Sequence, residues 1–177
     1  MSESLKKLPH VIRFDALANI QKRSWRDLNT GQPQANTLDG HLWLDPQNAI
    51  QLAYQIAQIR GQQRPSYAAQ YQKNAQIFAQ KINFQTQQIK QQFAHLSNRD
   101  YVAYHDAYQY LEAPLDLDFK GSIGISPEQK PSAKHLLQLK QQVKKYQWHC
   151  LLTEPQFDKS LADKVFGTTG RYTMVDE

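Results

Sequence analysis

The sequence is poor in the features that mark several common classes of protein. It contains one cysteine, Cys150, in 177 residues, and a single thiol excludes an internal disulfide framework or a multi-cysteine zinc site. No apolar run approaches the roughly 20 residues needed to cross a bilayer, so no membrane insertion of the chain is expected. The first residues, MSESLKKLPHVIRF, have neither the apolar core nor the cleavage site of a signal peptide. A chain with this start is expected to stay in the cytoplasm.

Sequence signatures of several enzyme classes are missing as well. There is no P-loop, no GxGxxG and no HExxH motif, so a nucleotide site or a zinc protease has no motif to support it. No GxSxG elbow occurs, and Ser126 lies in a proline-containing loop, so a serine hydrolase is poorly supported. The pattern favours a binding protein over an enzyme.

The charge balance is basic but diffuse along the sequence. The formal net charge is +5 and the pI is near 9.2. Lys and Arg are scattered among Gln and Asp, and the densest clusters are the pairs at 6–7 and 144–145. We interpret these residues as a solvated surface and expect no nucleic acid partner. A hydrophobic fraction of 40% predicts a globular chain with a packed core.

The first hundred residues predict a short helix, one strand, an amphipathic stretch that ends near Trp25, a loop and two further helices. The sequence VIRF at 11–14 predicts the strand, and the Gly, Pro, Asn and Asp residues at 28–40 predict an exposed loop. Asp45 stands at an N-cap position and Pro46 at the first helical position, so a helix should begin there and end near Gly61.

The clearest periodic signal lies between Pro65 and Ser97. This stretch has no internal Gly or Pro, and one helix over it would be about 45 Å long, enough to cross a domain or to link two. Its apolar residues recur on one stripe. The members of the stripe that we expect to be buried are Tyr71, Phe78, Ile82, Ile89 and Phe93.

Short apolar runs alternate with helical segments in the second half of the sequence. Strands are predicted at 101–105, 115–125, 149–153 and 171–175, and helices at 133–146 and 157–165. This alternation implies crossover connections between parallel strands. The predicted fold class is therefore α/β, with a small, mostly parallel sheet of about four strands flanked by helices, and with a long linking helix. Because no covering helix follows the last strand, we expect the sequence to be truncated there.

Two of the six histidines occupy positions that suit a ligand site. His41 precedes the apolar run LWL at the end of the loop, and His105 ends the predicted strand YVAYH. Ligands gather at the carboxyl ends of parallel strands, and Glu154 and Asp176 follow two further predicted strands toward the same edge. Spacing alone does not separate ligands from structural residues, and Glu154 is better explained as a cap of the next helix.

Several segments of the sequence form a series that is specific as a whole. They are HLWLDP at 41–46, the long helix, YVAYHDAYQYLE at 101–112, GSIGISPEQKPSAKHL at 121–136, CLLTEPQF at 150–157 and TMVD at 173–176. In order and approximate spacing this series resembles the C-terminal half of the ABC-importer solute-binding proteins for zinc or manganese, most closely the zinc-uptake (ZnuA-like) type.

The resemblance implies a metal site. In that family two α/β lobes are joined by a long helix, and residues of both lobes hold the metal. By matching motif, the ligands in this chain would be His41, His105 and Asp176. The zinc branch has histidine in the HDAY motif and the manganese branch has glutamate, so Zn²⁺ is expected and Mn²⁺ is disfavoured, as the preference of zinc for imidazole also implies. Asp106 or a backbone carbonyl is expected to orient one of the rings.

The resemblance also implies a place in transport. The intact protein would be a periplasmic monomer that binds zinc and delivers it to the membrane permease of an ABC importer. Residues 1–40 would be a remnant of the N-terminal lobe with its connecting loop, residues 41–97 the helices including the linking helix, and residues 98–177 a C-terminal α/β lobe truncated at its C-terminus. A further histidine ligand of the family would lie in the missing lobe.

Two other functions stay open from the sequence. One is a metal-binding surface module like the adhesins related to this family. The other is a zinc hydrolase, which would need three protein ligands, an open position and a base such as Glu154, and we expect that the protein is not an enzyme. In the zinc branch the equivalent of Cys150 pairs with a cysteine near the C-terminus. That partner would lie beyond Glu177, so a free thiol at the sheet edge is expected.

Overall fold

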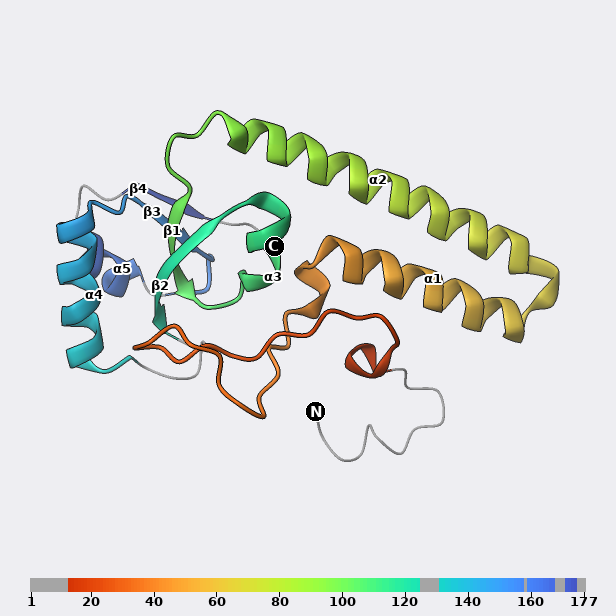
Figure 1. Cartoon of the computed structure of the whole chain (residues 1–177), viewed down its shortest axis with the longest axis horizontal. Helices are drawn as coiled ribbons and strands as arrows, with labels where there is room; N and C mark the ends of the chain where they lie inside the picture. Colours follow the sequence, from red (N-terminus) through yellow and green to blue (C-terminus); the bar gives the residue numbers. More distant parts are fainter. Residues whose placement is uncertain (1–12, 125–130, 158, 168–170, 175–177) are drawn as a thin grey trace. The chain divides into compact units, whose positions relative to one another are not determined.

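The chain divides into two compact units in the computed structural model. The described residues are 13–124, 131–157, 159–167 and, for the backbone alone, 171–174. One unit comprises Met1–Lys22 and Leu42–Gln87, and the other comprises Arg23–His41 and Gln88–Glu177. Figure 1 shows the helices and strands of both units. The three-part division of the sequence at residues 40 and 97 stays a prediction.

Helices make up the first unit. Helix α1 is Pro46–Gln63, with Asp45 as its N-cap, so the predicted start is confirmed and the end lies slightly beyond Gly61. A Cβ atom at Gly61 would lie 3.2 Å from the Cβ atom of Ala68. Glycine at this position therefore allows the end of α1 to approach the start of the next helix closely.

The long helix predicted from the sequence is present. A 3-10 turn at Pro65–Tyr67 leads into α2, Ala68–Ala94, and α2 runs from the first unit into the second. None of the described helices combines the length and the apolarity of a membrane span.

The prediction that the apolar stripe of α2 is buried is wrong. The buried residues of α2 are Ala75 and Ala79, whereas Phe78 and Ile89 are 39% and 38% exposed. The other members of the stripe are half-buried: Tyr71, Ile82 and Phe93. The small alanines lie at the centre of the packed face and the larger side chains lie along its margins. A helix that packs on one side only leaves those margins in contact with solvent.

The second unit is built on a four-stranded parallel sheet. Its strands are β1 (Asp100–His105), β2 (Asp118–Gly124), β3 (Cys150–Thr153) and β4 (Arg171–Met174). The spatial order is β2-β1-β3-β4, and each neighbouring pair is parallel. The helices of this unit are α3 (Gln109–Leu115), α4 (Ala133–Tyr146) and α5 (Lys159–Phe166). The predicted α/β fold class and the four strands are confirmed.

The core of this unit lies on one face of the sheet, between the strands and helices α4 and α5 (Figure 1). Its buried members are Val102, Tyr104, Ile123, Leu139, Val143, Trp148, Leu151, Ala162 and Val165. Because side chains alternate along a strand, the neighbours of Val102 and Tyr104 in β1 point to the opposite face. His105, the last residue of β1, is one of these neighbours and points to the opposite face.

Two further expectations are corrected. Phe14 does not lie in a strand but begins a 3-10 turn, Phe14–Ala16, and the rest of the predicted strand except Arg13 lies outside the described residues. No described strand pairs with this segment, and an unpaired strand leaves its backbone groups without ladder partners. Cys150 is free, as expected, but it begins β3, which lies between β1 and β4 and is not an edge strand.

Candidate metal centre

Two imidazole rings meet at the carboxyl end of β1. Nε2 of His105 lies 3.3 Å from Nε2 of His41, and the ring centroids are 5.2 Å apart with the ring planes at 57°. Both residues belong to the second unit. His105 is the last residue of β1, and His41 ends the loop that precedes α1. The structure thus brings together two of the three residues that the sequence marks as ligands.

A buried carboxylate lies behind the His41 ring. Oδ1 of Asp39 is 2.6 Å from Nδ1 of His41, and the same oxygen accepts a hydrogen bond from the backbone N–H of His41 at 3.0 Å. Asp39 is 1% exposed. A proton on Nδ1 that is donated to this carboxylate leaves the lone pair of Nε2 directed at His105.

Helix α3 explains why Asp39 is buried in a segment that the sequence predicts as an exposed loop. The side-chain amide of Gln109 donates to Asp39 and also to the backbone carbonyl of Ser24 at 3.0 Å. The hydroxyl of Tyr110 donates to the backbone carbonyl of Asp39 at 3.2 Å and accepts from the backbone N–H of Arg23 at 2.8 Å. These long-range hydrogen bonds attach both ends of the loop to α3. The prediction of an exposed connection is therefore wrong at Asp39.

A second buried carboxylate lies behind the His105 ring. Nδ1 of His105 is 3.2 Å from Oε1 of Glu154, although it is not aligned for a hydrogen bond with any group in the described part of the chain. The Tyr108 hydroxyl donates to the same carboxylate oxygen at 2.6 Å. Burial raises the pKa of the Glu154 carboxyl, but the His105 ring and the Tyr108 hydroxyl outweigh it and hold the pKa below its usual range. The carboxylate is therefore ionised at neutral pH.

The role expected of Glu154 from the sequence is wrong. Its carboxylate does not cap the next helix, because α5 begins only at Lys159 and the carboxylate is held by Tyr108 and by the amide of Gln156 at 3.0 Å. The residue directly follows β3, and the sequence signal that identifies it is this position at the carboxyl edge of the sheet.

Asp106 does not orient a histidine ring, contrary to the expectation from the sequence. Its carboxylate accepts hydrogen bonds from Arg26, with Nε at 2.7 Å from Oδ2, and Nη1 of Arg26 donates to Glu112 at 2.7 Å. The guanidinium also lies 3.6 Å from the centroid of the Phe119 ring. Burial lowers the pKa of Arg26, but the two carboxylates outweigh it and raise the pKa above its ordinary value. A stronger partner thus holds Asp106 away from the imidazoles.

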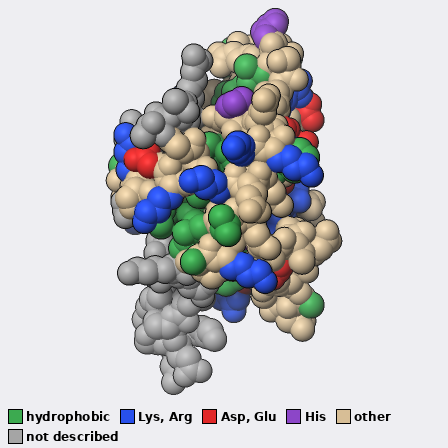
Figure 2. Space-filling view, turned by 90° about the vertical axis from the view of Figure 1, so that its left-hand side faces the viewer, with side chains coloured by type: hydrophobic (Ala, Val, Ile, Leu, Met, Phe, Trp, Pro, Cys, Tyr) green, Lys and Arg blue, Asp and Glu red, His purple; other side chains and the backbone are tan. Residues whose placement is uncertain are grey.

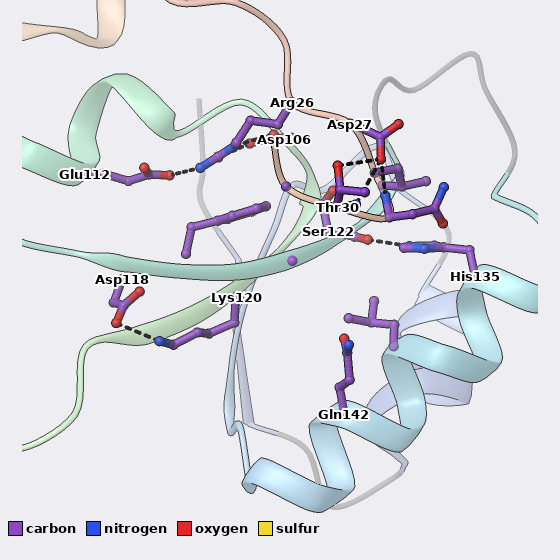
Figure 3. Close-up of a pocket in the computed structure, with 16 residues that line it drawn as sticks. Arg26, Asp27, Thr30, Asp106, Glu112, Asp118, Lys120, Ser122, His135 and Gln142 are labelled. Carbon is purple, nitrogen blue, oxygen red and sulfur yellow. Dashed lines mark hydrogen bonds and ion pairs between the residues drawn. The ribbon is translucent and has the colours of Figure 1, made fainter. Parts of the chain in front are cut away.

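A cavity of about 420 Å³ lies beside this ion pair, as Figure 3 shows. Its walls come from the loop at 26–31, from β2 and from α4. His135 lines it and directs Nε2 at the backbone carbonyl of Ser122, at 2.8 Å, so this ring serves a structural contact. Neither His41 nor His105 lines the cavity, so it is distinct from the imidazole pair.

The spacing of the two imidazole nitrogens suits a tetrahedral metal ion. Zinc binds imidazole nitrogen at about 2.0–2.1 Å, and two ligands at the tetrahedral angle are then about 3.3 Å apart. Asp176, the third expected ligand, lies outside the described residues. Within the residues that are described, no group of three or more His, Cys, Asp or Glu side chains is placed to hold an ion. The described part of the chain therefore presents two imidazole nitrogens at a spacing that suits one metal ion.

An α/β lobe, a long helix and a histidine pair at the carboxyl edge of the sheet thus occur together in the described part of the chain. The chain belongs to the ZnuA family, "Zinc-uptake complex component A periplasmic", whose model matches residues 2–177. This match confirms the resemblance found in the sequence.

Individual relatives agree with this assignment. The chain is 37% identical over 139 residues to the high-affinity zinc uptake system protein ZnuA of Brucella abortus, covering 78% of this chain and 42% of that protein. It is 31% identical over 131 residues to the protein of the same name from Haemophilus ducreyi, covering 74% and 42%. The chain thus spans less than half the length of these curated relatives.

Solved structures show the same fold. A Zn(II)-bound variant of AdcAII from Streptococcus pneumoniae superposes with a TM-score of 0.74 at 28% identity, covering 90% of this chain and 58% of that one. A variant of the laminin-binding adhesin Lmb from Streptococcus agalactiae gives a TM-score of 0.72 at 30% identity, covering 85% and 56%.

Proposed function

We propose that the chain binds Zn²⁺ through Nε2 of His41 and Nε2 of His105, as part of a periplasmic protein that delivers zinc to the permease of an ABC importer. The observation that carries this proposal is the 3.3 Å separation of the two Nε2 atoms, with Nδ1 of each ring beside a buried carboxylate. An imidazole that carries its proton on Nδ1 presents the lone pair of Nε2, and two such lone pairs at this separation attract a cation to one point.

The choice of zinc rests on the ligand chemistry and on the relatives. Imidazole nitrogen is a borderline ligand that suits zinc better than manganese. The names of the relatives refer to zinc uptake, and AdcAII has been solved with Zn(II) bound. We propose Asp176 as a third ligand from this chain, with Mn²⁺ bound more weakly than Zn²⁺.

Binding without turnover is the function that this site supports. A zinc hydrolase needs a base with access to a metal-bound water, and Glu154 is the candidate that the sequence offers for this role. Its carboxylate is 5% exposed and already interacts with Tyr108, Gln156 and His105. These interactions make it an orienting group for His105, so we propose that the protein is a transport component and not an enzyme.

Calorimetric titration with Zn²⁺ tests the proposed ligands. His41→Ala and His105→Ala should each weaken binding by more than the roughly 10- to 100-fold that loss of an outer-sphere partner costs. His95→Ala and His149→Ala are matched controls, because they remove exposed imidazoles elsewhere in the chain. If the parent protein binds zinc and both test variants bind it equally well, the two histidines are not ligands.

Delivery to an importer needs a separate test. Cells that lack the gene should grow poorly in medium containing a zinc chelator, and the gene carrying His105→Ala should restore growth less than the unaltered gene. Restoration by the variant to the full level would contradict a transport role for this site, even if the purified protein binds zinc.

A further inference from the structure

Two neighbouring helices account for the net positive charge of the chain. Helices α4 and α5 contain six lysines and one aspartate, an excess of five positive charges. The whole chain has a formal net charge of +5, so the remaining residues together are neutral. Helices α4 and α5 pack against each other, so their lysines lie on one part of the second unit in three dimensions.

The solvent-facing side of α4 presents lysines around an apolar residue. Lys134, Lys140 and Lys144 are exposed and share that side of the helix with Leu137, which is 58% exposed. The opposite side is buried in the core. Figure 2 views the molecule from the α4 end and shows Lys and Arg side chains around exposed hydrophobic ones. Among the described residues, no carboxylate forms an ion pair with a lysine of α4.

A shallow groove extends the apolar part of this surface. It lies between the ends of α4 and α5 and has a volume of about 270 Å³. Apolar side chains line it, including Val143, Trp148 and Phe166, and Lys140 and Lys144 lie at the same groove. Lysines thus lie beside apolar side chains both on the solvent-facing side of α4 and at this groove.

We propose that this α4–α5 face binds the surface of an anionic lipid bilayer. Charge complementarity favours that partner, since anionic headgroups attract clusters of lysines next to apolar side chains. The helices carry lysine and no arginine. Lysine acts as a flexible point charge, whereas recognition of a defined carboxylate or phosphate pair favours the rigid fork of arginine. A diffuse layer of headgroups suits such a surface better than a specific acidic peptide, and Leu137 would insert among the headgroups.

The expected strength follows from the number of lysines. Each Lys near an anionic membrane surface contributes about a fivefold increase in partitioning, so the removal of three should reduce it roughly a hundredfold. The interaction should also weaken steeply between 0.05 M and 0.5 M salt, because the Debye length falls to a few ångströms. The face includes neither His41 nor His105, so the proposal does not depend on zinc binding.

Vesicle co-sedimentation of the full chain tests the proposal. The vesicles are phosphatidylcholine alone, or phosphatidylcholine mixed with the anionic lipid phosphatidylglycerol. The parent should bind the anionic vesicles and not the neutral ones. The triple variant Lys134→Gln, Lys140→Gln, Lys144→Gln should lose binding. The matched control is Lys73→Gln, Lys81→Gln, Lys90→Gln, which removes the same charge from exposed positions on α2.

Three outcomes would overturn the proposal. Equal loss in the α4 and α2 triple variants would show that net charge alone attracts the vesicles. No binding of the parent to anionic vesicles at low salt would exclude the membrane as the partner. Binding of a purified acidic protein that depends on Lys140 and Lys144, without any vesicle binding, would assign the face to a protein instead. In support, a polarity-sensitive dye on Leu137→Cys in a Cys150→Ala background should shift to shorter wavelength with anionic vesicles, and one on Phe84→Cys of α2 in the same background should not.

Discussion

Asp39 is the residue whose replacement most directly tests how the histidine pair is organised. Its carboxylate is 1% exposed and bonds both the backbone N–H and, at 2.6 Å, Nδ1 of His41. Asp39→Asn keeps the size and shape of the side chain but removes the negative charge that stabilises the Nδ1 proton. Outer-sphere changes of this kind cost about 10- to 100-fold in metal affinity, which is about 1.4–2.7 kcal/mol. Zinc affinity should fall by that factor.

The assay is competition with a chromophoric chelator, run on Asp39→Asn and on a matched variant. Asp27→Asn serves as the control, because Asp27 lies in the same loop and bonds the backbone N–H groups of Asn29 and Thr30 within its own turn. The control should bind zinc like the parent. Thermal unfolding of both variants checks that the loop still folds, since Asp39 also accepts a hydrogen bond from Gln109.

A double-mutant cycle separates an effect through His41 from a general effect on the lobe. If Asp39 acts by orienting His41, Asp39→Asn should change zinc affinity less than about twofold when His41→Ala is already present. An unchanged zinc affinity in folded Asp39→Asn would refute the reasoning. So would an equal loss in the parent and in the His41→Ala background.

Four further predictions follow from individual contacts. Tyr110→Phe should lower the free energy of unfolding by about 1–3 kcal/mol in urea titrations, because the N–H of Arg23 loses its acceptor; an unchanged midpoint would contradict this. Asp45→Ala should cost about 1 kcal/mol, since its carboxylate accepts from the N–H groups of Gln47 and Asn48, and Asp45→Asn should cost less. Burial raises the pKa of the Cys150 thiol, so iodoacetamide at pH 8 should modify the folded protein more slowly than the urea-unfolded one. Equal alkylation rates of the folded and unfolded protein would contradict this. Because the folded-state pKa is the higher one, the stability contributed by the protonated Cys150 thiol is complete below the unfolded-state pKa near 8.5 and is lost as pH rises through the folded-state pKa. Zinc affinity should fall between pH 7.5 and pH 5.5, because protons compete with the metal for imidazole nitrogen, and a flat profile would argue against histidine ligands.

The elements of the α/β lobe were predictable because their signals are local. The strand YVAYH and the helix predicted at 133–146 each depend on residues within one element, and the structure places α4 at Ala133–Tyr146. His105 could be assigned to the binding edge for the same reason. A residue at the end of a parallel strand reaches that edge in any fold of this class.

The orienting groups could not be predicted, because they depend on pairings between distant segments. Asp106 adjoins His105 in the sequence, yet Arg26 holds it through a salt bridge across 80 positions. Asp39 lies in a segment rich in Gly, Pro and Asn, and its burial depends on contacts with Gln109 and Tyr110 of α3, 70 and 71 positions further along the chain. The spacing of apolar residues predicts which face of a helix or strand is buried, but it does not predict which partner a charged side chain binds.

The electrostatics of the histidine pair explain why it should favour a divalent cation. Two carboxylates, Asp39 and Glu154, are 1% and 5% exposed, and the ion-pair partners recorded for them within the described residues are His41 and His105. Buried charges cost free energy unless they are paired, and a neutral imidazole offsets a carboxylate only as a hydrogen-bond donor. One shared proton between the Nε2 atoms would offset a single negative charge. A divalent ion at the same place would offset both negative charges, so the buried charge of the two carboxylates contributes to the affinity for the metal.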